Sequence, residues 1–186
     1  HPPRSLLELV EAQGIPAVAL GGAPEWIDRP CVNPDPGAAV REVIDRLVML
    51  GHRHIALAVS DRRYPITASF CAMCQDALSE HGIQLSKGDV LEGLTPDLGG
   101  GLFAGHRLLA GGDARPTAVL FTNDWMALGG MYAFIEAGLK IGTDISVVGQ
   151  DNMRWCNQTA PSLTSIDHNE QDMIRLAVTK LTEQIR

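Results

Sequence analysis

The sequence lacks a surplus of positive charge. Its 186 residues contain 15 lysines and arginines against 22 aspartates and glutamates, which gives a formal net charge of −7. Contacts with phosphate groups require a basic surface, so this composition argues against nucleic-acid binding by the chain itself. The same acidic balance disfavours attachment to an anionic membrane surface.

Long apolar runs are also missing. The longest ones, such as residues 55–59 and 145–148, are far shorter than the roughly 20 residues needed to cross a bilayer. The first residues show no charged segment followed by a long apolar stretch, so no secretory signal is visible. We therefore expect a cytoplasmic protein without a membrane partner, and a natural start upstream of His1 is left open.

Cysteine is scarce, since Cys31, Cys71, Cys74 and Cys156 are too few for a disulfide scaffold in a chain of this length. Cys71 and Cys74 form a C-x-x-C pattern, which can indicate a redox pair or half of a zinc site. No second pair lies at ligand spacing, so we interpret both as buried apolar residues one helical turn apart. Neither a metal nor another cofactor is expected.

Several motifs of enzymes are absent. The chain has no G-x-S-x-G nucleophile elbow and no Gly-Lys-Ser/Thr phosphate loop. His52 and His54 are two residues apart and do not share a helix face, which disfavours a metal site. Three consecutive glycines at 99–101 predict a turn before a short helix at 102–110 rather than a nucleotide site. The sequence therefore does not indicate an enzyme.

What the sequence does contain is an alternation of short apolar runs and helical patterns. The runs at residues 17–20, 55–59, 118–121 and 145–148 are rich in Val, Ile, Leu and Ala, as in strands buried on both faces. The first helical pattern has Asp35 as its predicted N-cap, Pro36 as its first residue and Gly51 as its stop. Further helices are predicted from near Thr67 to Gly82, from Asn123-Asp124 to Gly138, and from about Asn169. This alternation predicts an α/β fold with a parallel sheet.

Polar side chains follow two of the predicted strands at their carboxyl ends. Asn123 follows the strand at 118–121, and Asp151 follows the strand at 145–148. Ligands of open parallel sheets bind beyond these ends, so both residues are candidates to meet one ligand. An amide and a carboxylate together suit a neutral polyhydroxylated molecule. Helix capping is the favoured role of Asp124, and a turn role for Asp151 is equally compatible with the local sequence.

Five segments occur in a particular order and spacing. They are residues 32–35 (VNPD), 50–56 (LGHRHIA), 116–129 (PTAVLFTNDWMALG), 144–151 (DISVVGQD) and 161–166 (PSLTSI). Together they resemble the regulatory domain of the lactose-repressor/galactose-repressor (LacI/GalR) transcription regulators. The resemblance implies a type I periplasmic-binding-protein-like fold, with two doubly wound parallel-sheet subdomains joined by three crossovers and an effector between them.

The resemblance also implies a division of the chain. Residues 1–50 would be a remnant of a truncated N-terminal subdomain, and residues 55–162 would be the C-terminal subdomain. Residues 163–186 would form a crossover and a helix that returns to the first subdomain. In this family a helix-turn-helix headpiece, which this chain lacks, binds operator DNA as a homodimer under the control of a small effector.

Candidate effector contacts follow from the same resemblance. Asn123 and Asp151 match contact positions of the family, and His168 falls near another. Phe70 stands where the family often has an arginine, and Thr95 where it often has an aromatic that stacks on the ligand. Phe70 offers either a stacking face or a core side chain.

The missing arginine favours a neutral sugar as the effector, because a guanidinium is the group that best recognises a carboxylate or phosphate. Arg62 and Arg63 could supply that charge, but two adjacent loop arginines are expected to be solvated.

Three functions are compatible with these features. A ligand-responsive repressor is favoured, in which the effector prefers one subdomain arrangement and thereby shifts the population of the DNA-binding state. A periplasmic or transporter-linked sugar-binding protein would share the architecture but would require a secretory signal. A doubly wound enzyme is disfavoured because no nucleophile, metal cluster or phosphate loop occurs.

Overall fold

The computed structural model describes residues 4–21 and 29–185 and divides the chain into two compact units. The smaller unit comprises His1–Asp35, Tyr64–Ile66 and Asn169–Arg186, and the larger unit comprises Pro36–Arg63 and Thr67–His168. No helix among the described residues is long and apolar enough to cross a membrane.

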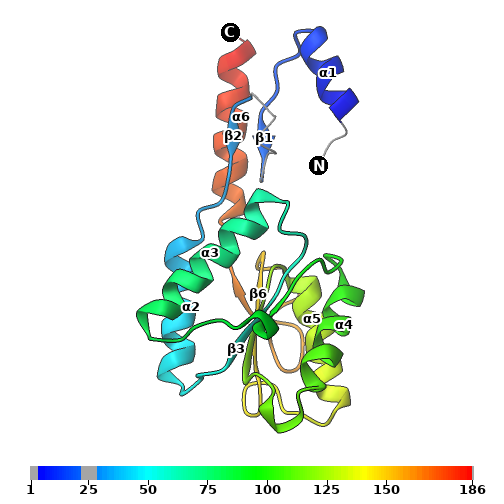
Figure 1. Ribbon diagram of the computed structural model, residues 1–186. Coiled ribbons are helices and arrows are strands. Elements are labelled where there is room, and N and C mark those ends of the chain that lie inside the picture. Colours follow the sequence, from blue (N-terminus) through cyan, green and yellow to red (C-terminus); the bar gives the residue numbers. More distant parts are fainter. Residues whose placement is uncertain (1–3, 22–28, 186) are drawn as a thin grey trace. The chain divides into compact units, whose positions relative to one another are not determined.

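Among its described residues, the smaller unit contains a two-stranded parallel sheet and two helices (Figure 1). Its elements are α1 (Arg4–Ala12), β1 (Ala19–Leu20), β2 (Cys31–Val32) and α6 (Glu170–Ile185). Helix α6 contacts both strands, and the Gln184 side chain hydrogen-bonds the backbone N–H and C=O of Ala17 at 3.2 and 3.3 Å. None of the described residues of α6 is buried, and Leu176 and Val178 are exposed. The resemblance implies a truncated N-terminal subdomain, and the described part of this unit has a sheet of two strands.

The larger unit is a parallel sheet with helices on both faces (Figure 1). Within the described residues its strand order is β4-β3-β5-β6-β7. The strands are β3 (Ile55–Ala58), β4 (Val90–Leu91), β5 (Ala118–Phe121), β6 (Ser146–Gln150) and β7 (Thr164–Ile166). The helices are α2 (Gly37–Met49), α3 (Pro65–Glu80), α4 (Leu98–Leu109) and α5 (Asp124–Glu136), with two short 3-10 helices, η1 (Lys87–Asp89) and η2 (Gly112–Ala114). The predicted α/β fold with a parallel sheet is confirmed.

The strands β3, β4, β5 and β6 each contribute to two hydrophobic cores, whereas β7 contributes Ile166 to the first. In β5, Ala118 and Leu120 pack with α2 and α3, whereas Val119 and Phe121 pack with α4 and α5. Successive side chains of a strand point to opposite faces, so both faces of β5 need apolar residues. Cys71 and Cys74 lie buried on α3 in the first of these cores, as the sequence indicated.

The structure divides the chain at Pro36 and not between residues 50 and 55, because α2 packs in the core of the larger unit. Val40 and Ile44 of this helix are fully buried in the same core as β3 and α3, so α2 belongs to the larger unit. The other predicted boundary moves too, because β7 pairs with β6 and brings Thr164 opposite Val148. The larger unit therefore runs from Pro36 to His168, apart from Tyr64–Ile66.

The ends of α2 follow the predicted chemistry at one end only. Gly51 adopts a φ of 93°, and the N–H groups of Gly51 and His52 bond to the carbonyls of Val48 and Leu47, each at 3.0 Å. This is the Schellman arrangement, which favours glycine. The predicted N-cap, Asp35, is wrong by one residue. The Pro36 carbonyl accepts the first helical bond, from Val40 N–H at 2.8 Å, so Pro36 is the N-cap.

The predicted glycine-rich turn at 99–101 is also wrong, because these glycines lie inside α4. A Cβ on Gly101 would lie 1.9 Å from the Met126 carbonyl oxygen of α5, and one on Gly129 would lie 2.1 Å from the Leu98 carbonyl oxygen. Glycine is therefore required for the close approach of α4 and α5. Asp97 caps the helix instead, accepting a hydrogen bond from Gly100 N–H at 2.8 Å.

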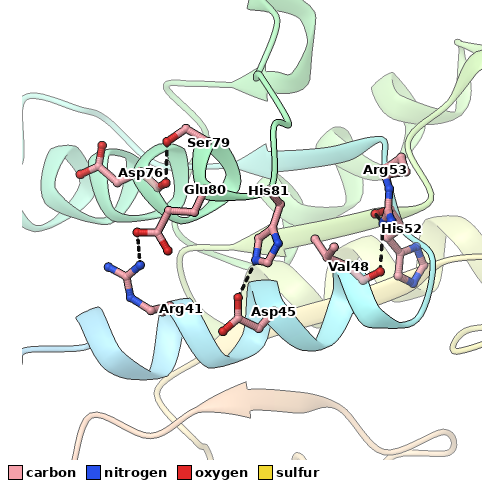
Figure 2. A network of polar contacts seen from close by, with 9 residues as sticks. All are labelled: Arg41, Asp45, Val48, His52, Arg53, Asp76, Ser79, Glu80 and His81. Atoms are coloured by element: carbon pink, nitrogen blue, oxygen red, sulfur yellow. Dashed lines mark hydrogen bonds and ion pairs between the residues drawn. The ribbon is translucent and has the colours of Figure 1, made fainter.

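Polar contacts join α2 to α3 at the surface (Figure 2). Arg41 pairs with Glu80, and His81 Nε2 lies 2.6 Å from Asp45 Oδ1. Exposed pairs of this kind contribute little to stability, typically about 0–1 kcal/mol.

His52, which follows α2, makes a more buried connection. Its two ring nitrogens lie 2.9 Å from Thr117 Oγ1 and 2.9 Å from Ser146 Oγ, at the amino ends of β5 and β6. Burial lowers the pKa of His52, which favours the neutral ring that this bridge between two hydroxyls can use.

Replacing Gly101 with alanine tests the close approach of α4 and α5. We expect Gly101→Ala to lower the free energy of unfolding by about 3 kcal/mol, because the methyl group has no room beside the Met126 backbone. Gly99→Ala in the same helix is the control. Its Cβ would meet only the Asp97 carboxylate at 3.3 Å, so we expect a change within about 1 kcal/mol. Urea denaturation measures both, and equal effects would contradict this account of the glycines.

Candidate functional site

The carboxyl ends of the strands in the larger unit carry a row of polar residues, which we call the carboxyl edge. It consists of Ser60, Thr122, Asn123, Gln150, Asp151, Asp167 and His168, which follow or end β3, β5, β6 and β7. Hydrogen bonds link residues of this edge to each other and to the neighbouring strand β5. Ser60 N–H donates to Thr122 Oγ1 at 3.4 Å, and Gln150 Nε2 donates to the Phe121 carbonyl at 3.3 Å. The parallel sheet thus brings the predicted strand-end residues to one edge.

Asn123 serves as the N-cap of α5. Its Oδ1 accepts a hydrogen bond from Met126 N–H at 2.8 Å, and its Nδ2 donates to the Pro96 carbonyl at 3.3 Å. The amide therefore keeps one N–H and one acceptor lone pair for further bonds. The interpretation of Asp124 as the cap is wrong, because the cap lies one residue earlier.

Asp124 is instead a fully buried carboxylate at the start of α5. It accepts hydrogen bonds from Ser165 Oγ at 2.6 Å, Met153 N–H at 2.8 Å and Cys156 Sγ at 3.0 Å. Burial and the Asp124 carboxylate raise the pKa of Cys156 to about 12, so this thiol stays protonated at neutral pH. This cluster was not predicted from the sequence, because its members lie far apart along the chain.

Asp151 begins the loop after β6 in an unusual backbone conformation. Its φ is 100° and that of Asn152 is 47°, a region that non-glycine residues enter at a cost of about 1–3 kcal/mol each. The Asp151 N–H donates to the Ile166 carbonyl of β7 at 3.0 Å, while its side chain is 44% exposed. The carboxylate therefore faces solvent on a backbone that is held by β7.

His168, the other strand-end candidate, lies beside Asp151. Its Nε2 is 3.7 Å from Asp151 Oδ1. Its Nδ1 is buried and has no hydrogen-bond partner among the residues that the structure describes. Burial lowers the pKa of His168, although the nearby Asp167 and Asp124 carboxylates act in the opposite direction. A neutral imidazole next to a partly exposed carboxylate results.

The structure places the other two predicted contacts differently. Phe70 is 3% exposed and packs in the core with α2 and β3, which agrees with its interpretation as a core side chain. Thr95 is exposed in the loop before α4, where its hydroxyl donates to Asp97 Oδ1 at 2.9 Å. Its neighbour Pro96 is the residue that accepts the Asn123 amide.

Arg62 and Arg63 are both engaged with acidic side chains. Arg62 Nη1 lies 2.9 Å from Glu92 Oε1, and the Arg63 Nε donates to Asp61 Oδ2 at 2.7 Å. These hydrogen bonds from Arg63 lower the pKa of Asp61. The two arginines that could have favoured an anionic ligand thus already have carboxylate partners.

The capping role of Asn123 can be separated from any role in ligand binding. We expect Asn123→Ala to destabilise the protein by about 1 kcal/mol, because the Met126 N–H loses its acceptor. Asn123→Asp should retain most of the stability, since aspartate is an equally good N-cap, while it removes both amide N–H donors. Thermal denaturation distinguishes the two variants. Equal stability of the wild type and Asn123→Ala would show that this cap is not needed.

Comparisons with known proteins agree with this architecture. A family model described as a periplasmic binding protein-like domain matches residues 44–186. The HTH-type transcriptional regulator MalR of Streptomyces coelicolor is 35% identical over 182 residues, which cover 96% of this chain and 52% of that protein. Catabolite control protein A of Priestia megaterium is 28% identical over 95% of this chain and 53% of its own length. The chain thus spans about half the length of these curated relatives.

Solved structures give the same result. A transcriptional regulator of the LacI family from Sanguibacter keddieii matches with a TM-score of 0.83 and 31% identity, over 91% of this chain and 63% of that one. A LacI family regulator from Enterococcus faecium with bound ribose matches with a TM-score of 0.83 and 25% identity, over 99% of this chain and 67% of that one. The predicted periplasmic-binding-protein-like fold is confirmed. The chain belongs to the periplasmic binding protein-like domain family, and its relatives there are transcription regulators of the LacI family.

Proposed function

We propose that this chain is the effector-binding part of a ligand-responsive transcription regulator, and specifically of a repressor that acts in the cytoplasm. The names of its relatives carry this proposal, since MalR of Streptomyces coelicolor is an HTH-type transcriptional regulator and the Pasteurella multocida relative is a transcriptional repressor, PurR. These names favour regulation over a transporter-linked sugar-binding role. Operator DNA is bound by a helix-turn-helix headpiece outside these 186 residues, in keeping with the net charge of −7.

The effector controls DNA binding through a shift between subdomain arrangements. A ligand that binds one arrangement more tightly increases its population by the difference in binding free energy, and no other effect of the ligand is needed. The carboxyl edge of the larger unit supplies effector contacts in this proposal, namely Asp151, His168 and Asn123, with Thr95 as a further candidate. Phe70 is a core residue in this proposal, and its ring packs α3 against the sheet.

A neutral sugar is the effector that this edge favours. Asp151 offers a partly exposed carboxylate that accepts two hydroxyl hydrogens, and the neutral His168 adds no positive charge. Arg62 and Arg63 are already engaged with Glu92 and Asp61. An anion would therefore meet negative charge at Asp151, whereas hydroxyl groups would find acceptors. The related Enterococcus faecium structure holds ribose, and a Haemophilus influenzae relative is a ribose operon repressor.

The full protein acts as a homodimer in this proposal, and the outer faces of α4 and α5 form part of the contact. Large apolar side chains are exposed on both helices: Leu98, Phe103, Trp125, Tyr132 and Ile135. Exposed aromatic residues are typical of protein–protein contacts. A second copy of the chain is the occupant that the LacI-family resemblance implies.

Loss of the Asp151 carboxylate should weaken sugar binding. We expect Asp151→Ala to cost about 2–5 kcal/mol of binding free energy, because it removes up to two charged hydrogen bonds that water replaces in part. Asp151→Asn is the variant safest for folding, since asparagine tolerates positive φ, and we expect it to weaken binding about tenfold. A thermal-shift screen of ribose, glucose, maltose and citrate identifies the ligand, and calorimetry measures its affinity.

Asp113→Asn is the matched control. Asp113 lies in η2, before the amino end of β5, and β5 runs parallel to β6, so this residue is at the opposite edge of the sheet from Asp151. It should bind the same sugar with unchanged affinity. Tight binding of citrate, or unchanged sugar affinity in Asp151→Ala, would contradict the assignment of this site.

The proposed dimer contact can be tested at Tyr132, which is 51% exposed on α5. We expect sedimentation velocity to show a dimer for the wild type and a monomer for Tyr132→Glu, because the new charge would be buried against a second copy. Gln75→Glu introduces the same charge on the exposed surface of α3 and should leave the dimer intact. A dimer that survives Tyr132→Glu would place the contact elsewhere.

A further inference from the structure

We infer that Asp124, acting through Ser165, is a positioning residue that holds the loop carrying Asp151 in its binding conformation. This inference rests on the proposed function only in treating Asp151 as a ligand contact. Asp124 itself is fully buried, so its role is to orient the loop and not to touch the effector.

The loop needs support from outside itself. Asp151 and Asn152 both have positive φ, and non-glycine residues keep such angles only where the surroundings hold them. The backbone N–H groups of Asn152 and Met153, which follow Asp151, are bound by groups on other elements. Asn152 N–H donates to Ser165 Oγ of β7 at 2.9 Å, and Met153 N–H donates to Asp124 Oδ2 of α5 at 2.8 Å.

The direction of the hydrogen bonds at Ser165 is determined by its partners. A backbone N–H can only donate, so Ser165 Oγ is the acceptor for Asn152. The hydroxyl hydrogen of Ser165 then points to Asp124 Oδ1, 2.6 Å away, which as part of a carboxylate can only accept. The carboxylate thus sets the orientation of the hydroxyl that holds Asn152. The Ser165 hydroxyl, the Met153 N–H and the Cys156 thiol all donate to Asp124.

The strand that leads to Asp151 leaves space for this carboxylate. A Cβ on Gly149 of β6 would lie 2.2 Å from Asp124 Oδ1, so only glycine fits at this position. Asp124 therefore lies against β6 two residues before Asp151 and also binds the loop two residues after it. Helix capping does not explain this arrangement, because Asn123 already caps α5.

Hydrogen exchange in the absence of any ligand tests the support of the loop. Ser165→Val and Ser165→Thr have nearly the same shape, and only threonine keeps the hydroxyl. We expect the amides of Asn152 and Met153 to exchange at least about tenfold faster in Ser165→Val, and at close to the wild-type rate in Ser165→Thr. Val147 and Val148 within β6 serve as internal controls and should be unaffected. Equal exchange of Asn152 and Met153 in both variants would overturn the inference.

Binding of D-ribose tests the link to Asp151. We expect Ser165→Val to weaken ribose binding by about tenfold, and Asp151→Asn to cause little further loss in the Ser165→Val background. Losses that add fully would show that the two residues act independently and would overturn the positioning role. Absence of ribose binding by the wild type would contradict the choice of sugar in the proposed function, and the exchange experiment would still decide whether Ser165, the hydroxyl that Asp124 orients, holds the loop.

Discussion

Burial of the parallel sheet on both faces is the constraint on which the larger unit depends. The strands β3 to β6 supply apolar side chains to two cores at once, as Val119 and Leu120 do on opposite faces of β5. In β3, β5 and β6, polar side chains are then confined to the strand ends or lie beyond them. The carboxyl edge with Asn123, Asp151 and His168 is therefore a direct consequence of how the core is built.

The helices on the second face follow a different rule. Glycines let α4 and α5 approach until Gly101 lies against the Met126 backbone. No large side chain fits between the helices at this contact, so the large side chains of both helices lie in the core or on the outside. Trp125 and Tyr132 consequently remain exposed although the helices themselves are tightly packed. Trp125 is in turn 5.1 Å from Trp155, measured between ring centroids, so the loop after β6 also touches this exposed helix. The outer face and the carboxyl edge thus share one loop.

A single buried carboxylate joins the elements around that loop. Asp124 belongs to α5, lies against Gly149 of β6, and binds Ser165 of β7 together with Met153 of the loop. A buried charge is tolerated where hydrogen-bond donors surround it, and here a hydroxyl, a backbone amide and a thiol do so. The positive φ angles of Asp151 and Asn152 can therefore persist without glycine.

The sequence by itself determined the alternation of strands and helices, the apolar strands, and the placement of Asn123 and Asp151 at one edge, because these depend on local periodicity and on the geometry of parallel sheets. Glycine stops such as Gly51 were also readable, since they need only a local left-handed conformation. Only the tertiary structure decided that the glycines at 99–101 are helical, that α2 joins the larger unit, and that Phe70 is a core residue. The difference between Asn123 as a cap and Asp124 as a buried acceptor also came from tertiary contacts. Each of these outcomes depends on partners far away in the chain, such as Met126 for Gly101 and Ser165 for Asp124, and no local pattern specifies them.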